Sequence, residues 1–493
     1  MLHRRRGACL LIVLSSMAFA GTDLESNKTG RRNTSGVLPI TTSSARARKQ
    51  FEHAMQNLEY VRSDTAVADL RQAVKTDPRF AQAHILLSYL SKAPEEQRTS
   101  RTRAKQLAPH VSEGERLLIR WLAGVQEDNY VPAIAAMNDL LAKYPRDERV
   151  AFIAGMWLVG QERYSQAVTI LERAVKLAPD YPAALNELAY AYAFSGSFEA
   201  AFEVMKRYVA LQPDQPNPYD SYGEILRLAG KFEAALEQYR MSIRVDPSFG
   251  SELGVADTLA VMGHEQEARE EYQRAIVLVA NEAERVEYEM QSAATWIRED
   301  NHKQACKALG EVARHAHTAG LGRLEAEAHR VLAIYERDYK SAMKQVQAAQ
   351  AALEHGHEMS LTEKTEEQAR IIRVKAVRSA EAQGFDVASG AVKLLESMAQ
   401  KSRSQVVHYS YEASAGALLL AQGKYAEAIS HLEEEAENPL TMRLLRKAYS
   451  MTGATPQAEQ MGARLTNLNM PTAEQALVVP RFRASLVSQA KHP

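Results

Sequence analysis

A proline recurs every 34 residues through the middle of the chain, at Pro145, Pro179, Pro213 and Pro247. The same spacing places an aromatic residue at Tyr130, Tyr164, Phe198 and Phe232. It also places an alanine at Ala133, Ala167, Ala201 and Ala235. Three columns that agree on one period indicate a supersecondary unit repeated in tandem. Since each such unit buries its apolar side against its neighbours, the chain is expected to form an array and not one globular core.

Each unit is predicted to be a pair of antiparallel helices, for example over residues 182–195 and 198–211, joined at Gly196. Ala, Leu, Glu, Gln and Arg fill long stretches without Gly or Pro, which is helix-forming composition. Runs of β-branched residues between turn residues are almost absent, so we expect an all-α fold. Small residues on the first helices are expected to face the alanine column on the second helices and let the axes approach. These small residues are Gly155, Ala189 and Gly223.

These columns resemble the tetratricopeptide repeat, which carries a small residue, an aromatic, an alanine and a proline at set positions of a unit of about 34 residues. The likeness is best over residues 114–281, although Trp121 replaces the usual small residue of its unit, and it returns over 409–442. Residues 51–113 and 282–408 keep the helix-pair rhythm but lose most columns. The resemblance implies a right-handed superhelical solenoid with a concave groove, and roughly ten to twelve pairs fit within residues 51–467.

The two ends of the chain are predicted to lie outside the array. Arg4, Arg5 and Arg6, an apolar run and a small-x-small site ending at Ala20 indicate a signal peptide over residues 1–20. Residues 21–50 are predicted to be a flexible linker, and residues 468–493 a C-terminal tail. This leader predicts export to the periplasm or beyond. Parts of the chain also resemble exported or signalling-linked bacterial repeat proteins. No integral membrane segment is expected once the leader is removed.

Charge and cysteine content narrow the possible functions. The formal net charge is −1, and the basic residues concentrated in the first fifty residues leave an acidic body, so nucleic acid is not an expected partner. Cys306 is the one cysteine after the leader and cannot form an internal disulfide. It is interpreted as a small buried apolar residue, with a reactive thiol as the alternative.

The sequence carries no recognisable catalytic, cofactor or metal motif. Gly230-Lys231-Phe232 lacks the upstream glycine and the Ser or Thr of a phosphate-binding loop. His315 and His317 are two residues apart, a spacing that points helical side chains in different directions and disfavours a shared metal. We therefore expect no enzyme activity, no cofactor and no metal.

The expected function is a non-catalytic scaffold that binds a protein or peptide in the groove. The groove positions that the resemblance implies are Arg149, Phe152, Met156, Asn186, Tyr190, Phe194, Asp220, Glu224 and Arg227. Phe152 and Phe194 have inter-repeat packing as an equal alternative. Glu187, Asp220 and Glu224 disfavour the carboxylate clamp of some family members. The alternative function is a ligand-sensing or regulatory subunit of a signalling or envelope-assembly complex.

Overall fold

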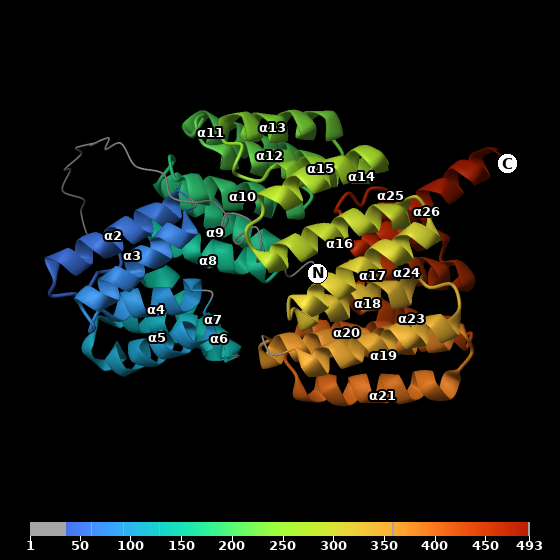
Figure 1. The fold of residues 1–493 in the computed structure, drawn as a ribbon. Helices are drawn as coiled ribbons and strands as arrows, with labels where there is room; N and C mark the ends of the chain where they lie inside the picture. The colour runs from blue at the N-terminus through green and yellow to red at the C-terminus, as the bar shows by residue number, and fades with distance from the viewer. Residues whose placement is uncertain (1–35, 61, 92, 128, 357–358, 492–493) are drawn as a thin grey trace. The chain divides into compact units, whose positions relative to one another are not determined.

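The structure, a computed structural model, describes residues 36–60, 62–91, 93–127, 129–356 and 359–491. All regular secondary structure in these ranges is helical (Figure 1). The all-α expectation is confirmed for this part of the chain. The signal peptide, its cleavage site and the first part of the predicted linker lie outside the described residues.

The chain divides into two compact units, unit 1 (Met1–Ile225 and Arg244–Phe249) and unit 2 (Leu226–Ile243 and Gly250–Pro493). Unit 1 is built from consecutive helix pairs in which each first helix packs against the helix that follows it. The pairs are α2 (Ala45–Glu59) with α3 (Ser63–Thr76), α4 (Ala81–Leu90) with α5 (Pro94–Leu107), α6 (Glu113–Gln126) with α7 (Tyr130–Lys143), α8 (Glu148–Gly160) with α9 (Tyr164–Leu177), and α10 (Pro182–Phe194) with α11 (Phe198–Leu211). The division between the units runs through α12 (Pro216–Leu228) and α13 (Phe232–Val245).

Unit 2 continues with six further pairs and a final helix. The pairs are α14 (Glu252–Met262) with α15 (Glu265–Leu278), α16 (Glu282–Arg298) with α17 (His302–Thr318), α18 (Gly322–Tyr335) with α19 (Tyr339–His355), α20 (Leu361–Glu381) with α21 (Phe385–Lys401), α22 (Gln405–Ala421) with α23 (Tyr425–Leu432), and α24 (Pro439–Thr452) with α25 (Thr455–Thr466). The final helix is α26 (Ala473–Lys491). The predicted helix-pair rhythm therefore extends through residues 282–408.

The two helices of a pair differ in how they are buried. In α10 almost every residue from Pro182 to Ala193 is buried, while in α11 the buried residues form one stripe that includes Ala201, Met205 and Tyr208. A helix that is apolar all round needs neighbours on all sides, and a helix with one apolar stripe needs them on one side. Within this pair, the first helix therefore lies in the interior of unit 1 and the second helix covers it.

The turns within pairs explain the glycine positions. Gly196 has φ +82°, which glycine adopts without strain, and Ser197 N–H donates to the Tyr192 carbonyl at 2.8 Å to close the turn. Glu162 takes the same left-handed conformation, with φ +59°, in the preceding pair. Pro182 occupies the first turn of α10, where a missing N–H costs no helical hydrogen bond.

Close packing between the helices of a pair is confirmed at Gly155. A Cβ added there would lie 2.4 Å from the Leu171 side chain. Leu171 follows the predicted partner Ala167 by four residues and lies on the same face of α9. Ala167 and Ala201 are both fully buried, as their column requires.

The loss of the 34-residue columns in residues 282–408 has a structural cause. Helices α16, α17, α19 and α21 are each 17 residues long and α20 has 21, against 13 or 14 in α8 to α11. Longer helices lengthen the repeat, so a search at a fixed spacing loses the register. Figure 1 shows these longer helices stacked in succession, from yellow to orange.

The predicted linker is too long at its C-terminal end. Helix α2 begins at Ala45, with the Ser44 side chain capping it, so residues 45–50 belong to the array. The segment before it is also held in place, since Leu38 N–H donates to Asp147 Oδ2 at 2.8 Å and Thr41 N–H donates to Glu115 Oε1 at 2.9 Å. Leu38 itself is buried. Backbone hydrogen bonds to buried carboxylates are the reason that this polar segment is ordered.

The predicted C-terminal tail is wrong for residues 473–491, which form α26 and pack against α16, α24 and α25. Leu477, Val478 and Val479 supply the buried apolar surface. The Arg483 guanidinium donates to the Thr466 carbonyl at 2.8 Å and to Asn469 Oδ1 at 2.9 Å. The tail prediction failed because Pro480 interrupts an otherwise helical pattern.

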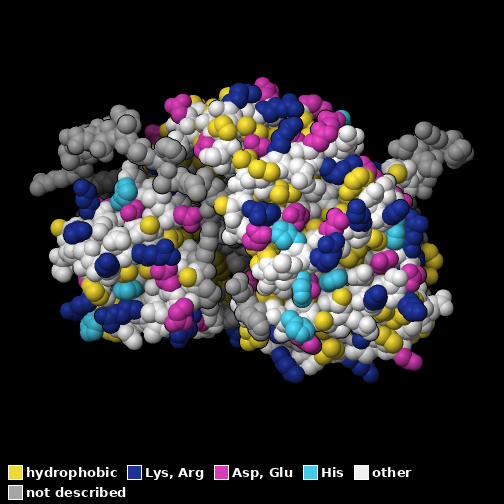
Figure 2. Space-filling model, in the orientation of Figure 1, with side chains coloured by type: hydrophobic (Ala, Val, Ile, Leu, Met, Phe, Trp, Pro, Cys, Tyr) yellow, Lys and Arg dark blue, Asp and Glu magenta, His cyan; other side chains and the backbone are white. Residues whose placement is uncertain are grey.

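Within the described ranges, none of the helices is both long enough and apolar enough to cross a membrane. The face shown in Figure 2 mixes Lys and Arg with Asp and Glu over both units. Interspersed charge of both signs is typical of solvated helix faces.

Candidate functional site

Unit 1 contains a pocket among its first helices, with an empty volume of about 590 Å³ including its open mouth. Its walls come from α2, α4, α8 and α10, with one residue from the start of α3. The lining residues are Leu58, Ser63, Leu86, Tyr89, Leu90, Phe152, Ile153, Met156, Ala183, Asn186 and Glu187. Most of this surface is apolar, and a few polar groups converge on it, which is the usual character of a binding pocket.

The Glu187 carboxyl is the unusual polar group of this pocket. Glu187 is 8% exposed, and no hydrogen bond or ion pair reaches it within the described residues. Burial raises the pKa of Glu187 to about 7. An ionised carboxylate in an apolar wall without a partner is costly, so this group favours either a proton or a ligand that donates to it.

Asn186 adds a second acceptor beside Glu187. The residue is 3% exposed, and its Oδ1 has no hydrogen-bond partner among the described residues. On the opposite wall, burial raises the pKa of Tyr89 to about 12, and the charge of Glu187 contributes to the shift. The pocket therefore presents two buried oxygen acceptors to an occupant.

Three of the predicted groove residues, Phe152, Met156 and Asn186, lie together in this pocket. Phe152 is 6% exposed and its ring packs on Tyr181 with centroids 5.0 Å apart, so it also serves the core. Arg149 does not line the pocket and forms an ion pair with Glu59 of α2, Nε to Oε1 2.6 Å. This pair links α8 to α2.

Tyr190, Phe194 and Glu224 form a separate group. Tyr190 is 4% exposed, donates its hydroxyl to Glu224 Oε2 at 2.8 Å, and stacks on Phe194 with centroids 5.9 Å apart. Asp220 is half-buried on α12. The stripe of Asn186, Tyr190 and Phe194 is thus divided, because Asn186 reaches the pocket and Tyr190 is packed against its neighbours. The burial of Tyr190 indicates that truncating it would lower stability.

Arg227 lies in the core of unit 2, where it is 2% exposed. Its Nη1 lies 3.2 Å from Asp257 Oδ2, and Tyr272 donates its hydroxyl to Asp257 Oδ1 at 2.6 Å. A buried arginine paired in this way is a structural ion pair and is not exposed to a partner protein.

The pocket residues that the sequence did not single out come mostly from residues 51–113. Leu58, Leu86, Tyr89 and Leu90 lie where the repeat columns are lost, so no register assigned them to the groove. Glu187 carried a signal, because it replaces the asparagine common at its position in the family. From the sequence, this replacement disfavoured a carboxylate clamp but did not predict a pocket.

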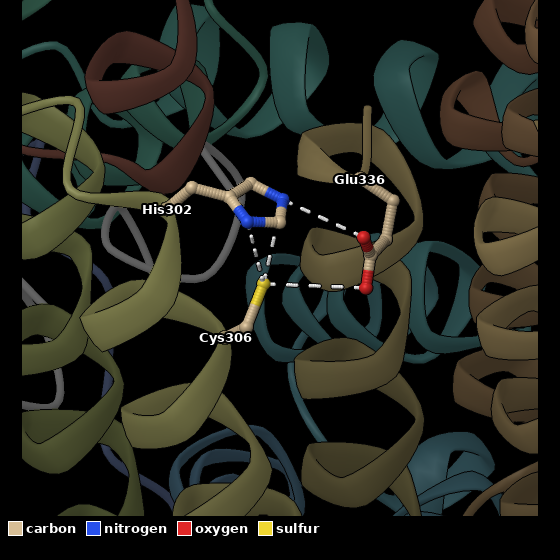
Figure 3. Close-up of side chains that lie close together, drawn as sticks. All are labelled: His302, Cys306 and Glu336. Atoms are coloured by element: carbon tan, nitrogen blue, oxygen red, sulfur yellow. Dashed lines mark hydrogen bonds and ion pairs between the residues drawn. The ribbon is translucent and has the colours of Figure 1, made fainter. Parts of the chain in front are cut away.

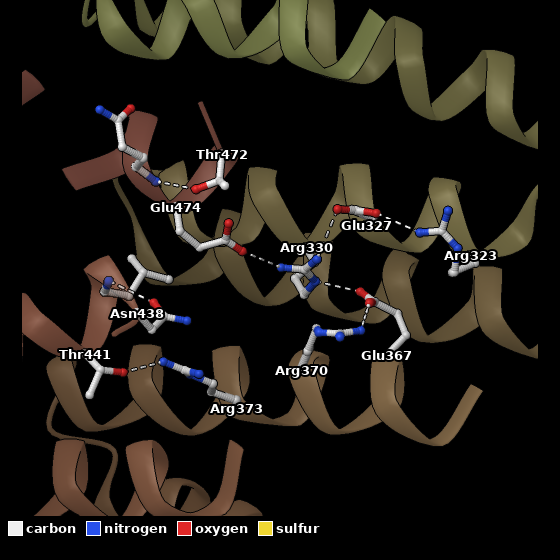
Figure 4. Close-up of polar contacts among 12 residues, drawn as sticks. Arg323, Glu327, Arg330, Glu367, Arg370, Arg373, Asn438, Thr441, Thr472 and Glu474 are labelled. Atoms are coloured by element: carbon white, nitrogen blue, oxygen red, sulfur yellow. Dashed lines mark hydrogen bonds and ion pairs between the residues drawn. The ribbon is translucent and has the colours of Figure 1, made fainter. Parts of the chain in front are cut away.

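The interior of unit 2 contains charged side chains that neutralise one another (Figure 4). Arg330 of α18 is 4% exposed, and its Nε donates to Glu367 Oε1 of α20 at 2.6 Å. Its other nitrogens lie 3.5 Å from Glu327 Oε1 and 3.6 Å from Glu474 Oε1 of α26. Burial alone would lower the pKa of Arg330, but these three carboxylates raise it well above its usual value.

Further arginines complete this network. Arg323 donates to Glu327 Oε2 at 2.9 Å, and Arg370 donates to Glu367 Oε2 at 3.0 Å. The contacts around Arg330 therefore join helices α18, α20 and α26. Separately, Arg373 of α20 donates to Glu435 Oε1 at 2.8 Å. It also donates to Thr441 Oγ1 of α24 at 2.8 Å (Figure 4).

His315 and His317 each have their own carboxylate partners. His315 Nδ1 lies 2.7 Å from Glu289 and its Nε2 lies 2.6 Å from Glu282, while His317 Nδ1 lies 3.0 Å from Glu325. Hydrogen bonding to Glu289 is the main cause that raises the pKa of His315, against the opposing effect of burial. The two side chains therefore contact different carboxylates.

Comparison with known proteins supports the repeat assignment. The tetratricopeptide repeat family model matches residues 154–216. Together with the helix pairs of the structure, this match shows that residues 154–216 form repeats of the tetratricopeptide type. Comparison with curated protein sequences gives no match.

Several solved structures resemble parts of the chain. A tetratricopeptide repeat protein from Parabacteroides merdae is 12% identical, with a TM-score of 0.35, and the match covers 50% of this chain and 98% of that one. PilW, a type IV pilus biogenesis factor, is 20% identical, with a TM-score of 0.31, and covers 42% and 96%. A tetratricopeptide repeat protein from Thermus thermophilus is 18% identical, with a TM-score of 0.27, and covers 41% and 92%. Tetratricopeptide repeat folds are typical of protein–protein interaction scaffolds.

Proposed function

We propose that the protein is a non-catalytic scaffold that binds a peptide segment of another protein in the unit 1 pocket. The observation that carries this proposal is the apolar pocket with two buried acceptors, Glu187 Oε and Asn186 Oδ1, that have no partner among the described residues. Each acceptor without a hydrogen bond costs on the order of 1–3 kcal/mol, and an occupant that donates to both recovers this energy.

The chemistry of the pocket selects its occupant. Leu58, Leu86 and Met156 offer contacts to an apolar stem, and Glu187 offers a negative charge to a donor head. A lysine side chain, with its long methylene stem and terminal ammonium group, meets both requirements. The occupant is therefore a peptide that inserts a lysine side chain, with its neighbours lying along α8 and α10.

We also propose that the protein acts outside the cytoplasm. The basic start, apolar run and small-x-small site of residues 1–20 favour export, so we propose that the partner lies in the periplasm or outside the cell. N-terminal sequencing of the protein from an envelope fraction tests this, and a chain that retains Met1 would contradict export with cleavage at Ala20.

Peptide selection tests the binding function. A library of random peptides displayed on phage is selected against the purified protein, and the dissociation constants of the selected peptides are measured by calorimetry. We expect a lysine at a fixed position, and we expect Glu187→Gln to weaken binding by about 10–100-fold, the effect of losing a charge-assisted hydrogen bond.

Two controls define this test. Glu203→Gln removes the same charge from an exposed position on α11, where Glu203 pairs with Lys206, and should leave the affinity unchanged. Met156→Ala should weaken binding through the apolar wall. Selected peptides that bind Glu187→Gln and Met156→Ala as tightly as the original protein would exclude this pocket as the binding site.

A small molecule with an amine is the second candidate occupant. Apolar walls with a few converging polar groups are also the usual lining of small-molecule sites. A ligand-sensing or regulatory subunit would use the pocket in this way. Stabilisation of the protein by free alkylamines, without enrichment of lysine in selected peptides, would favour this candidate.

A further inference from the structure

Three side chains with metal-binding groups converge in unit 2. His302 and Cys306 are four residues apart on α17 and therefore lie on one face of this helix. Glu336 follows the last residue of α18. Their ligand atoms all lie within 4.8 Å of one another, and Figure 3 shows the three side chains pointing toward a common centre.

The distances between these atoms suit a tetrahedral metal ion. Cys306 Sγ lies 3.7 Å from His302 Nε2, His302 Nε2 lies 3.5 Å from Glu336 Oε2, and Cys306 Sγ lies 4.0 Å from Glu336 Oε1. Zinc bonds of about 2.3 Å to sulfur and about 2.0–2.1 Å to nitrogen and oxygen separate tetrahedral ligands by roughly 3.3–3.6 Å. The two distances from His302 Nε2 lie close to these values, while the Glu336 carboxylate, whose two oxygens make the two contacts, must turn to bring one oxygen onto a shared ion.

The surroundings restrict the histidine and leave access from solvent. The ring of Tyr335 stacks on His302 with centroids 5.3 Å apart, and its hydroxyl donates to Asp300 at 3.4 Å. The side chains of His302 and Glu336 are 29% and 15% exposed. Stacking that limits the ring orientation lowers the entropy lost on binding, and partial exposure gives an ion a route to the site.

We propose that His302, Cys306 and Glu336 form a zinc site with three protein ligands and a fourth position open to water. One nitrogen, one sulfur and one oxygen ligand match the borderline-soft character of Zn²⁺ and do not match Mg²⁺ or Ca²⁺, which take oxygen ligands. The sequence predicted no metal because Glu336 lies thirty residues from Cys306 and has no sequence motif. The competing explanation is a His302–Glu336 ion pair with a neighbouring thiol that binds no metal.

Metal titration of the full-length protein separates these explanations. Zn²⁺ binding is measured by calorimetry in the presence of a reductant that does not bind metals, and Co²⁺ is used as a spectroscopic probe. We expect one tight site per chain and a thiolate-to-cobalt charge-transfer band. Cys306→Ser should abolish the band, and Cys306→Ser and Glu336→Gln should each weaken zinc binding at least tenfold.

The matched control is His317→Gln, which removes a histidine from the same helix outside the cluster and should leave zinc binding intact. If a cluster variant fails to fold, protection of Cys306 from alkylation by added Zn²⁺, read at its tryptic peptide by mass spectrometry, replaces it. Equal zinc affinity in Cys306→Ser and the original protein, or alkylation of Cys306 that zinc does not slow, would overturn the proposal. Tight binding of Mg²⁺ in preference to Zn²⁺ would also overturn it.

Discussion

Two buried charged groups, one in each unit, differ in how their neighbours compensate them. In unit 1 the first helix α10 buries Glu187 in an apolar wall, without a partner among the described residues. In unit 2 the first helix α18 buries Arg330 and surrounds it with Glu327, Glu367 and Glu474. A charge that its neighbours neutralise favours a closed interior, and a charge without a partner leaves a position for an occupant. On this comparison, the proposed pocket of unit 1 depends on an interior carboxyl that its neighbours leave without a partner.

Removing the central charge of unit 2 should have the largest effect. Arg330→Met leaves the buried carboxylates of Glu327 and Glu367 and the half-buried one of Glu474 with less compensation, so we expect a loss of about 3–5 kcal/mol in the free energy of unfolding. Urea denaturation measures this loss. Arg314→Met, at a side chain that is 75% exposed, is the control and should cost less than about 0.5 kcal/mol. A loss no larger than that of the control would mean that the network does not hold unit 2 together.

Removing the charge of Glu187 in unit 1 should have the opposite effect on the free energy of unfolding. The Glu187 carboxyl has a pKa of about 7 in the folded chain, against an ordinary value of 4.5. Its contribution to the stability of the folded chain is therefore complete below pH 4.5 and is lost as the pH rises through 7. Glu187→Gln should therefore stabilise the ligand-free protein by about 2–4 kcal/mol at pH 8 and by little at pH 4. Melting curves at both pH values measure this, with Glu203→Gln as control. Destabilisation at pH 8 would show that Glu187 has a partner in solution.

Packing in the regular repeats provides a third test. Ala201 is fully buried between helices, so Ala201→Leu should lower the free energy of unfolding by about 1–3 kcal/mol or more. Ala210→Leu, at an exposed position of the same helix α11, should have little effect. Equal melting temperatures for the two variants would contradict the alignment of the helices within this pair.

The smallest expected effect concerns His315, which bridges Glu282 and Glu289 near the surface of unit 2. Its pKa is raised in the folded chain, so its stabilising contribution is complete below the ordinary value of 6.5 and is lost as the pH rises through the raised value. His315→Gln should cost up to about 1 kcal/mol at pH 5.5 and almost nothing at pH 9. The control is His317→Gln, at a side chain of the same helix that is 71% exposed, which should change the free energy of unfolding less than His315→Gln does at pH 5.5.

The sequence predicted the regular repeats well and their variations poorly. Helix α11 spans Phe198–Leu211 as predicted, and α10 ends at Phe194, one residue before the predicted end. Side-chain columns report helix pairs reliably when the helices keep a constant length. In residues 282–408 the helices vary in length, and the longer helices remove the columns without removing the pairs.

The candidate site was predictable only in part, because it combines residues from distant repeats. Phe152, Met156 and Asn186 follow from their positions in the unit, but Leu86 and Tyr89 contribute through the way α4 approaches α8 and α10. A single unit contains no information about that approach. Arg227 shows the opposite case. Its position in the repeat unit predicted a groove residue, but its side chain pairs with Asp257 in the core.

The contact of α26 with Arg330 also has a consequence for biosynthesis. Glu474 is translated long after Arg330, and α26 supplies part of the buried surface around α16 and α24. A nascent chain that has emerged only as far as α18 holds an arginine whose Glu367 and Glu474 partners have not yet been made. The pocket helices of unit 1, by contrast, are all present once Phe194 has left the ribosome. Unit 1 can thus complete its pocket during translation, whereas unit 2 must wait for α26 before its interior is neutralised.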